Sequence, residues 1–165
     1  MQEPHAADYR IPVRELLVRP DERRTVSVTI DAETAEQYGI ACRELPHAEG
    51  MLENRAGVLM FTYRLTCVPE AECDRCLSPA VLQIDEQFSH VVVTETAAEQ
   101  NDAEYLLAPD AVLDLAEAVM TDLRLSLPTK ILCSPDCKGL CPICGKNRNL
   151  GSCGCEDGAV TFQFE

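Results

Sequence analysis

The chain has 165 residues, of which 46% are hydrophobic and 25% are charged, and its formal net charge is -14. This composition predicts a folded globular protein and excludes global disorder, because it supplies enough apolar surface to bury. The acidic balance excludes a surface that binds nucleic acid throughout, since such surfaces rely on Lys and Arg to neutralise phosphates.

The opening residues, MQEPHAADYR, lack the basic patch and apolar run of an export signal. No stretch approaches the roughly eighteen apolar residues that a membrane span requires. We therefore expect a cytoplasmic protein without membrane contact. In that reducing compartment, clustered thiols hold metal more often than they form disulfides, so the ten cysteines point to metal binding.

The first half of the chain contains two predicted strands. Val26, Val28 and Ile30 alternate with polar residues, which is the period-two pattern of a strand with one buried face. The segment from Val58 to Cys67 is too apolar to be alternately solvated and predicts a central strand. Residues 31–46 are mixed and predict no clear element.

A hairpin and a loop follow in the predicted order. Alternating residues from Val81 to Val93 predict an extended run after the tetrapeptide CDRC, so we expect a hairpin with CDRC at its tip. Residues 96–104 are small and acidic and predict a loop.

The clearest predicted helix begins after Asp114, whose carboxylate can accept a hydrogen bond from a free backbone N–H of the first turn. It ends before Pro128, because proline cannot donate to the helical ladder. Its apolar stripe predicts packing on the sheet and consists of Leu115, Ala116, Val119, Met120 and Leu123.

These elements predict an α+β fold, with a mainly antiparallel sheet, one main packed helix and a small C-terminal all-cysteine zinc lobe. The expected organisation is a core domain over residues 1–127 that carries the first CxxC motif. A cysteine-rich zinc lobe over residues 128–155 is expected to pack on it, and residues 156–165 form a C-terminal tail.

Acidic residues are concentrated in the middle of the chain. No Lys or Arg lies between Arg75 and Arg124, where the acidic residues are Asp85, Glu86, Glu95, Glu99, Asp102, Glu104, Asp110, Asp114, Glu117 and Asp122. Such a segment suits a basic partner, such as a ribosomal protein or another nucleic-acid-binding protein. The alternative is that these charges only keep the protein in solution.

The chemistry lies in the cysteines. The C-terminal run CSPDCKGLCPICGKNRNLGSCGC contains Cys133, Cys137, Cys141, Cys144, Cys153 and Cys155. The two-residue spacing of Cys141 and Cys144 lets both sulfurs face one ion, and Gly145 permits the tight turn behind them. Cys73 and Cys76 repeat this spacing. Zinc takes four ligands in a tetrahedron, and thiolate sulfur is its usual structural partner.

Two partitions of these cysteines are open. The preferred one closes a local site from Cys141, Cys144, Cys153 and Cys155, and joins Cys73 and Cys76 to Cys133 and Cys137 in a second site. This partition predicts two zinc ions, with one as the alternative. The competing partition joins Cys73 and Cys76 to Cys141 and Cys144. Cys42 and Cys67 remain, and are interpreted as small buried apolar residues.

Two further observations bear on function. Residues 128–155 carry Lys130, Lys138, Lys146 and Arg148 against Asp136, which either invites RNA contact or offsets the negative charge of zinc-bound thiolates. No catalytic triad, carboxylate pair or phosphate loop is evident, and the three histidines lie far from the cysteine motifs. All-cysteine zinc sites are usually closed and structural, so we do not expect an enzyme.

In combination these motifs resemble the YceD-like family of large ribosomal RNA subunit accumulation proteins. The resemblance rests on CDRCL, the helix ending in LSLP, CKGLCPICGKNRN with its CG-x-N-x-N pattern, the closing CGC, the amino-terminal IPVRELL and the strand after Gly57. The last residues, GAVTFQFE, depart from the family pattern.

The resemblance implies a bacterial cytoplasmic protein that supports accumulation or processing of large-subunit ribosomal RNA during ribosome biogenesis. The implied partners are a ribosomal precursor particle, a ribosomal protein or an assembly factor, with contact to ribosomal RNA as an option and no small-molecule substrate. Two alternatives are a thiol redox or zinc switch and a zinc-ribbon adaptor in transcription.

Overall fold

The computed structural model describes residues 8–94 and 105–155. The chain divides into two compact units, which we call unit 1 (Met1–Glu70 with Leu82–Pro128) and unit 2 (Ala71–Val81 with Thr129–Glu165). The domain bounds 1–127, 128–155 and 156–165 stay a prediction. The predicted loop over 96–104, the acidic residues between 95 and 104, and the tail 156–165 lie outside the described residues.

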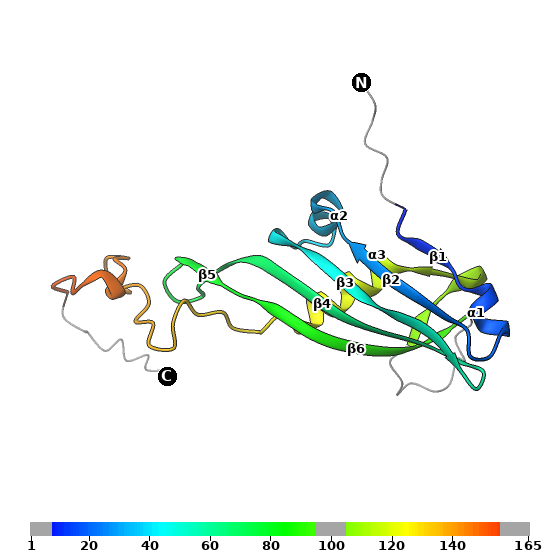
Figure 1. The fold of residues 1–165 in the computed structure, drawn as a ribbon. Helices are drawn as coiled ribbons and strands as arrows, with labels where there is room; N and C mark the ends of the chain where they lie inside the picture. Colours follow the sequence, from blue (N-terminus) through cyan, green and yellow to red (C-terminus); the bar gives the residue numbers. More distant parts are fainter. Residues whose placement is uncertain (1–7, 95–104, 156–165) are drawn as a thin grey trace, which may run out of the picture. The chain divides into compact units, whose positions relative to one another are not determined.

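Unit 1 is built around an antiparallel sheet (Figure 1). Its strands run in the order β2, β3, β4, β6, β7, and of the pairings along this order only that of β6 with β7 is parallel. Their bounds are Arg23–Thr29, Cys42–Arg55, Val58–Glu72, Ile84–Val93 and Tyr105–Leu107. A separate two-stranded ladder pairs β1 (Arg10–Pro12) with β8 (Val112–Asp114).

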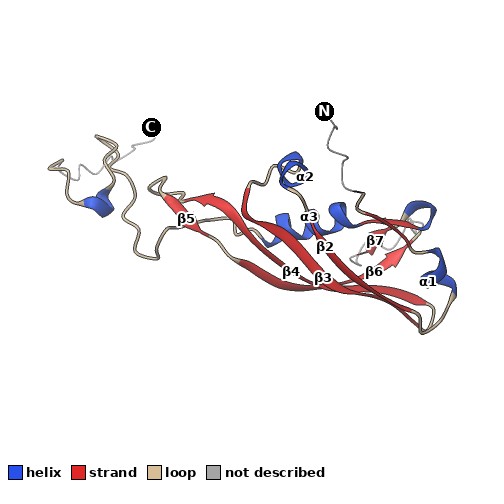
Figure 2. Cartoon of the chain, turned by 45° about the horizontal axis from the view of Figure 1, so that its top comes forward, coloured by secondary structure: helices blue, strands red, loops and turns tan. Residues whose placement is uncertain are grey.

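The long α3 (Leu115–Ser126) lies across one face of this sheet (Figure 2). The Asp114 side chain accepts a hydrogen bond from the backbone N–H of Glu117 at 3.1 Å, and so caps the helix as predicted. The predicted stripe is buried against sheet residues that include Leu52, Phe61 and Leu65. The shorter helices are α1 (Arg14–Val18), α2 (Ala32–Gln37) and the 3-10 turn η1 (Pro109–Ala111).

The hairpin of β3 and β4 turns through two residues, Ala56 and Gly57, between the paired Arg55 and Val58. Both turn residues have positive φ, at 51° and 91°, as a two-residue hairpin loop requires. β4 lies between β3 and β6, which confirms its predicted central place. The expectation that it is too apolar for a solvated face is wrong, because Thr62 and Arg64 on its second face are exposed.

A buried polar cluster ties α3 to the sheet. The Asp122 carboxylate accepts a hydrogen bond from the Tyr63 hydroxyl, and its Oδ2 lies 2.6 Å from Nε2 of His90. Asp122 and His90 are 5% and 6% exposed, so the cluster is in the core of unit 1. Burial, together with the neighbouring carboxylate, raises the pKa of Tyr63 far above its ordinary value. Breaking this cluster would leave buried polar groups unpaired.

Candidate metal centres

The first CxxC motif forms a tight turn between β4 and β5 (Pro79–Val81), which pair with each other. The backbone N–H of Leu77 donates to the carbonyl of Cys73 at 2.9 Å, and the N–H of Cys73 donates to Ser78 at 2.8 Å. This turn places Cys73 and Cys76 on the same side of the backbone. It also forces Leu77 into the left-handed region, with φ at 58°.

The segment that carries Cys133 and Cys137 is held against this turn by Asp74 and Arg75. The backbone N–H of Ile131 donates to the Asp74 carboxylate at 2.6 Å, and the N–H of Asp74 donates back to the carbonyl of Ile131 at 2.8 Å. Farther along, Nη1 of Arg75 donates to the carbonyl of Cys137 at 2.7 Å. Two residues inside the CDRC motif therefore position the other pair of cysteines.

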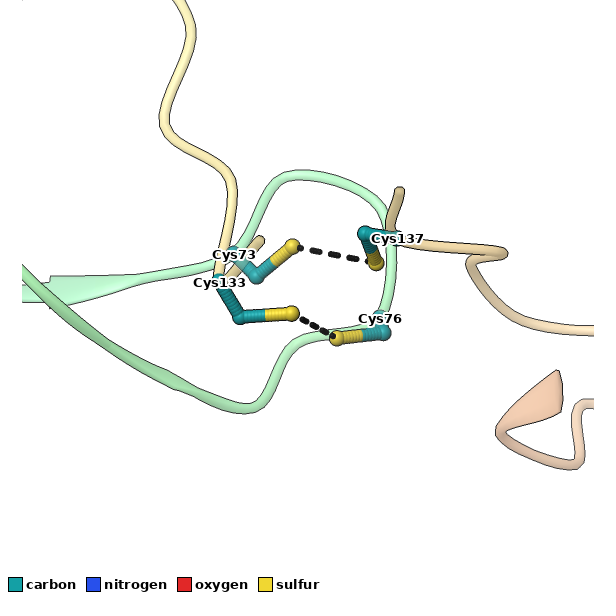
Figure 3. A group of neighbouring side chains, drawn as sticks. All are labelled: Cys73, Cys76, Cys133 and Cys137. Atoms are coloured by element: carbon teal, nitrogen blue, oxygen red, sulfur yellow. Dashed lines mark hydrogen bonds between the residues drawn. The ribbon is translucent and has the colours of Figure 1, made fainter. Parts of the chain in front are cut away.

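The four sulfurs of this first group point toward one another (Figure 3). The sulfurs of Cys73 and Cys137 lie 3.6 Å apart, and those of Cys76 and Cys133 lie 3.5 Å apart. All four lie within 4.8 Å of one another. A tetrahedral ion with sulfur ligands at ~2.3 Å requires sulfur separations of about 3.8 Å, so the spacing fits zinc. Cys133 is exposed, whereas the other three are buried.

The second group comprises Cys141, Cys144, Cys153 and Cys155, whose sulfurs also lie within 4.8 Å of one another. Its CxxC motif repeats the turn of the first, because the N–H of Gly145 donates to the carbonyl of Cys141 at 2.8 Å. Gly145 has a φ of 73°, so glycine occupies without strain the position that Leu77 holds in the first turn. Cys141 is buried and Cys144 is exposed.

The pKa values within each group are spread widely. Burial raises the pKa of Cys73, but backbone hydrogen bonds outweigh this effect and lower it to about 6. The neighbouring Cys76 sulfur and the other thiols raise the pKa of Cys133 to about 12. In the second group, backbone hydrogen bonds lower the pKa of Cys141 to about 6, and Cys144 with its neighbours raises that of Cys155 to about 12.

Hydrogen bonds and neighbouring thiolate charges account for this spread of pKa values. Hydrogen bonds lower the pKa of both Cys73 and Cys76 in the first group and of Cys141 in the second, so these thiols ionise more readily than a free thiol. Cys133 and Cys155 resist ionisation beside the neighbouring sulfurs unless a cation joins them. A dication bound at the centre would satisfy all four sulfurs. The donor set, the spacing and the charge requirement of both groups therefore fit zinc.

The structure brings the eight predicted residues together in the two groups that the preferred partition names. The competing grouping of Cys73 and Cys76 with Cys141 and Cys144 is not the one that forms. Cys42 and Cys67 belong to neither group, and their sulfurs lie 3.6 Å apart across β3 and β4. Burial raises the pKa of both thiols, that of Cys67 to about 12, as expected for thiols packed at an apolar core.

Comparison with known proteins adds a family match. The family model described as "Large ribosomal RNA subunit accumulation protein YceD" matches residues 61–165, which include both cysteine groups. Uncharacterized proteins of Mycobacterium bovis and of two strains of Mycobacterium tuberculosis are each 34% identical over 79 residues. That match spans 45% of this chain and only 37% of the relatives' own length. No solved structure matches.

No helix in the described part of the chain is both long enough and apolar enough to cross a bilayer.

Proposed function

The chain belongs to the YceD family of large ribosomal RNA subunit accumulation proteins, and from this premise we propose that it is a zinc-binding ribosome biogenesis factor. In this proposal it supports accumulation or processing of large-subunit ribosomal RNA in the cytoplasm and catalyses no reaction. The observation that carries the proposal is the pair of four-cysteine groups within the region that matches the family.

The role proposed for zinc is structural. Four thiolates complete a tetrahedron and leave no open position for a substrate or a water molecule. The Asp74 and Arg75 contacts hold the ligands of the first group in place, as outer contacts commonly do around a metal site. Zinc would then fix the loops of unit 2 into one shape, and that shape would be what a partner recognises.

The proposed partner is a ribosomal precursor particle, through a ribosomal protein, an assembly factor or the RNA itself. The acidic segment argues for a basic protein as the partner less strongly than its composition indicates. Asp122 is buried, Asp85 pairs with Arg64 at 2.6 Å, and Asp114 caps α3. These three carboxylates are therefore already used within unit 1, and the family match carries the partner proposal.

The cations of unit 2 offer a test between RNA contact and charge balance. Replacing Lys138, Lys146 and Arg148 together with Ala removes their charges but keeps the backbone bonds from Lys138 to the Asn149 side chain and from Arg148 to Gly139. We expect the triple variant to bind zinc less tightly while its association with precursor particles, corrected for folded fraction, is retained. Normal zinc content with lost RNA association would assign these side chains to RNA.

The experiment that tests the function is sedimentation of cell extracts with detection of the protein across the ribosomal fractions. The protein should migrate with large-subunit precursors and should leave those fractions when Cys76 is replaced with Ser. Cofractionation with RNA polymerase instead would support a transcription adaptor. A protein found only at the top of the gradient would contradict the proposal.

A redox or zinc switch is the second candidate, and one observation favours it. Each group presents one exposed cysteine, Cys133 in the first and Cys144 in the second, which an oxidant can reach. Zinc content measured after purification under reducing and mildly oxidising conditions separates the two roles. A structural site keeps its zinc in both, whereas a switch releases it on oxidation.

A further inference from the structure

The loop between the two cysteine pairs of the second group, Cys141 with Cys144 and Cys153 with Cys155, carries two asparagines that the proposed function does not use. This loop, Gly145–Ser152, connects Cys144 to Cys153, so a candidate ligand of the second group flanks it at each end. Asn147 and Asn149 lie in this loop, around the 3-10 turn η2 (Arg148–Leu150). Their side chains, however, reach toward the first group.

The side chain of Asn149 contacts the first group directly. Its Nδ2 donates to the sulfur of Cys137 at 3.3 Å, and its Oδ1 accepts from the backbone N–H of Lys138 at 2.8 Å. The two contacts fix the orientation of the amide. The reversed amide would place its oxygen against the sulfur and its NH₂ against a backbone N–H, which are both repulsive arrangements.

Asn147 holds this arrangement from the other side. Its Oδ1 accepts from the backbone N–H of Asn149 at 2.9 Å, and its Nδ2 donates to the Ser78 hydroxyl at 3.2 Å. Ser78 follows the CxxC turn of the first group by two residues. The loop of the second group is thus bonded to both halves of the first group, at the CDRC turn and at Cys137.

The backbone of the loop is attached in the same way. The N–H of Arg148 in the loop donates to the carbonyl of Gly139 at 2.9 Å, and just before the second group the N–H of Leu140 donates to the carbonyl of Arg75 at 3.0 Å. At Gly139 the chains are so close that a Cβ would stand 3.0 Å from the carbonyl oxygen of Arg75. Gly139 also has a φ of 71°, so any other residue here would be strained and would press on the turn at Arg75.

We propose that the loop Gly145–Ser152 couples the two zinc sites, with Asn149 as the positioning residue for Cys137. Zinc in the second group fixes both ends of the loop, which reduces the conformational freedom that Asn149 must lose to reach the sulfur. The N–H···S bond then fixes the orientation of the Cys137 sulfur toward the other three sulfurs of the first group. Filling the second site therefore raises the zinc affinity of the first, and by linkage the reverse holds with the same factor. This inference rests on the proposed zinc binding.

The test measures zinc affinity of the full chain by competition with a chelator. Asn149→Asp keeps the acceptor for Lys138 and replaces only the donor to sulfur with a negative oxygen. We expect it to weaken zinc binding at the first site about 10- to 100-fold, the usual effect of losing an outer contact. Leu150→Ala is the matched control, because this neighbouring side chain is 82% exposed. It should leave both affinities unchanged.

Alkylation followed by mass spectrometry identifies which cysteines have released zinc. Removing the second site with Cys153→Ser and Cys155→Ser should weaken the first site by a similar factor. Adding Asn149→Asp to that variant should then cost little more, because the same bond is already loosened.

The outcomes separate the coupling from the proposed function. Parent protein with two zinc ions and an unchanged first-site affinity in Asn149→Asp would overturn the coupling alone. Fully additive losses in the combined variant would overturn it too. Parent protein without zinc would overturn the proposed zinc binding itself.

Discussion

Removing zinc should unfold unit 2 and leave unit 1 folded. Among its described residues, which end at Cys155, unit 2 has little apolar core of its own, since the buried cluster there consists of Cys73, Cys76 and Cys137 with the partly buried Leu132 and Leu140. The core of unit 1 contains none of the eight candidate ligands. Adding a chelator that takes both ions therefore removes the main source of order from unit 2 only, and replacing Cys76 with Ser removes the ion of the first group.

The expected magnitude follows from comparing the two contributions. A structural four-cysteine zinc site contributes about 10–16 kcal/mol of apparent binding free energy at neutral pH. Two partly buried leucines contribute on the order of a few kcal/mol at most. Loss of both ions thus removes more free energy than the remaining apolar contacts supply, and the loops of unit 2 cannot stay ordered without them.

Hydrogen exchange read by mass spectrometry resolves the two units. The backbone N–H groups of Leu140, Cys141, Gly145 and Arg148 are hydrogen-bonded and should be protected in the zinc form. In metal-free protein they should exchange as fast as in an unfolded chain, while β3 and β4 of unit 1 stay protected. In Cys76→Ser the N–H of Leu140, which donates to Arg75 beside the first group, should lose protection, whereas those of Cys141 and Gly145 should keep it because all four ligands of the second group remain. Cys42→Ser is the matched control and should change neither. Persistent protection at Leu140 and Arg148 in metal-free protein would refute the reasoning.

Three further outcomes are expected. Gly145→Ala should destabilise unit 2 by about 1 kcal/mol in thermal unfolding, because it forces a side chain into positive φ, whereas the mirror change Leu77→Gly should be neutral or stabilising. Asp122→Ala should destabilise unit 1 by about 3–5 kcal/mol in denaturant unfolding, because it leaves buried polar partners unpaired. Burial raises the pKa of Cys67 to about 12, so folding favours the neutral thiol. The stability that the buried neutral thiol contributes is complete below about pH 8.5 and is lost as pH rises toward 12. Cys67→Ala should flatten that alkaline loss in a pH series.

Sequence patterns predicted the elements that have a strong apolar period. β2 buries Val26 with Val28 half-buried, and α3 buries the whole predicted stripe, because in both the residues that meet the core are large and apolar. The α+β class and the cysteine-rich region follow from the same signals. These features depend on local sequence alone.

The missed elements lack that signal. On its buried face β3 carries Ala48, Gly50, Leu52 and Asn54, which are too small or too polar to give an alternating apolar pattern. A Cβ on Gly50 would stand 2.1 Å from the carbonyl oxygen of Thr62, so small size at this position is a packing requirement. The helix α2 has only six residues and buries only Ala35, and its signal is correspondingly weak.

The candidate metal centres, too, could be predicted from the sequence only in part. Spacing was enough to favour the grouping of the cysteines, because Cys153 and Cys155 are near enough in sequence to close on Cys144. Spacing could not show that Asn149 contacts the sulfur of Cys137, since this bond joins the loop of one group to a ligand of the other. Nor could it pair His90 with Asp122, which are brought together only by packing α3 on the sheet.

The most direct test of the account is the zinc content of the intact chain, measured by native mass spectrometry alongside elemental analysis. Protein purified under reducing conditions without chelator should carry two zinc ions, and each group of cysteines should resist alkylation until its ion is removed. One ion per chain would contradict the two-site account. A fully folded unit 2 without any zinc would contradict its central claim that zinc holds this unit together.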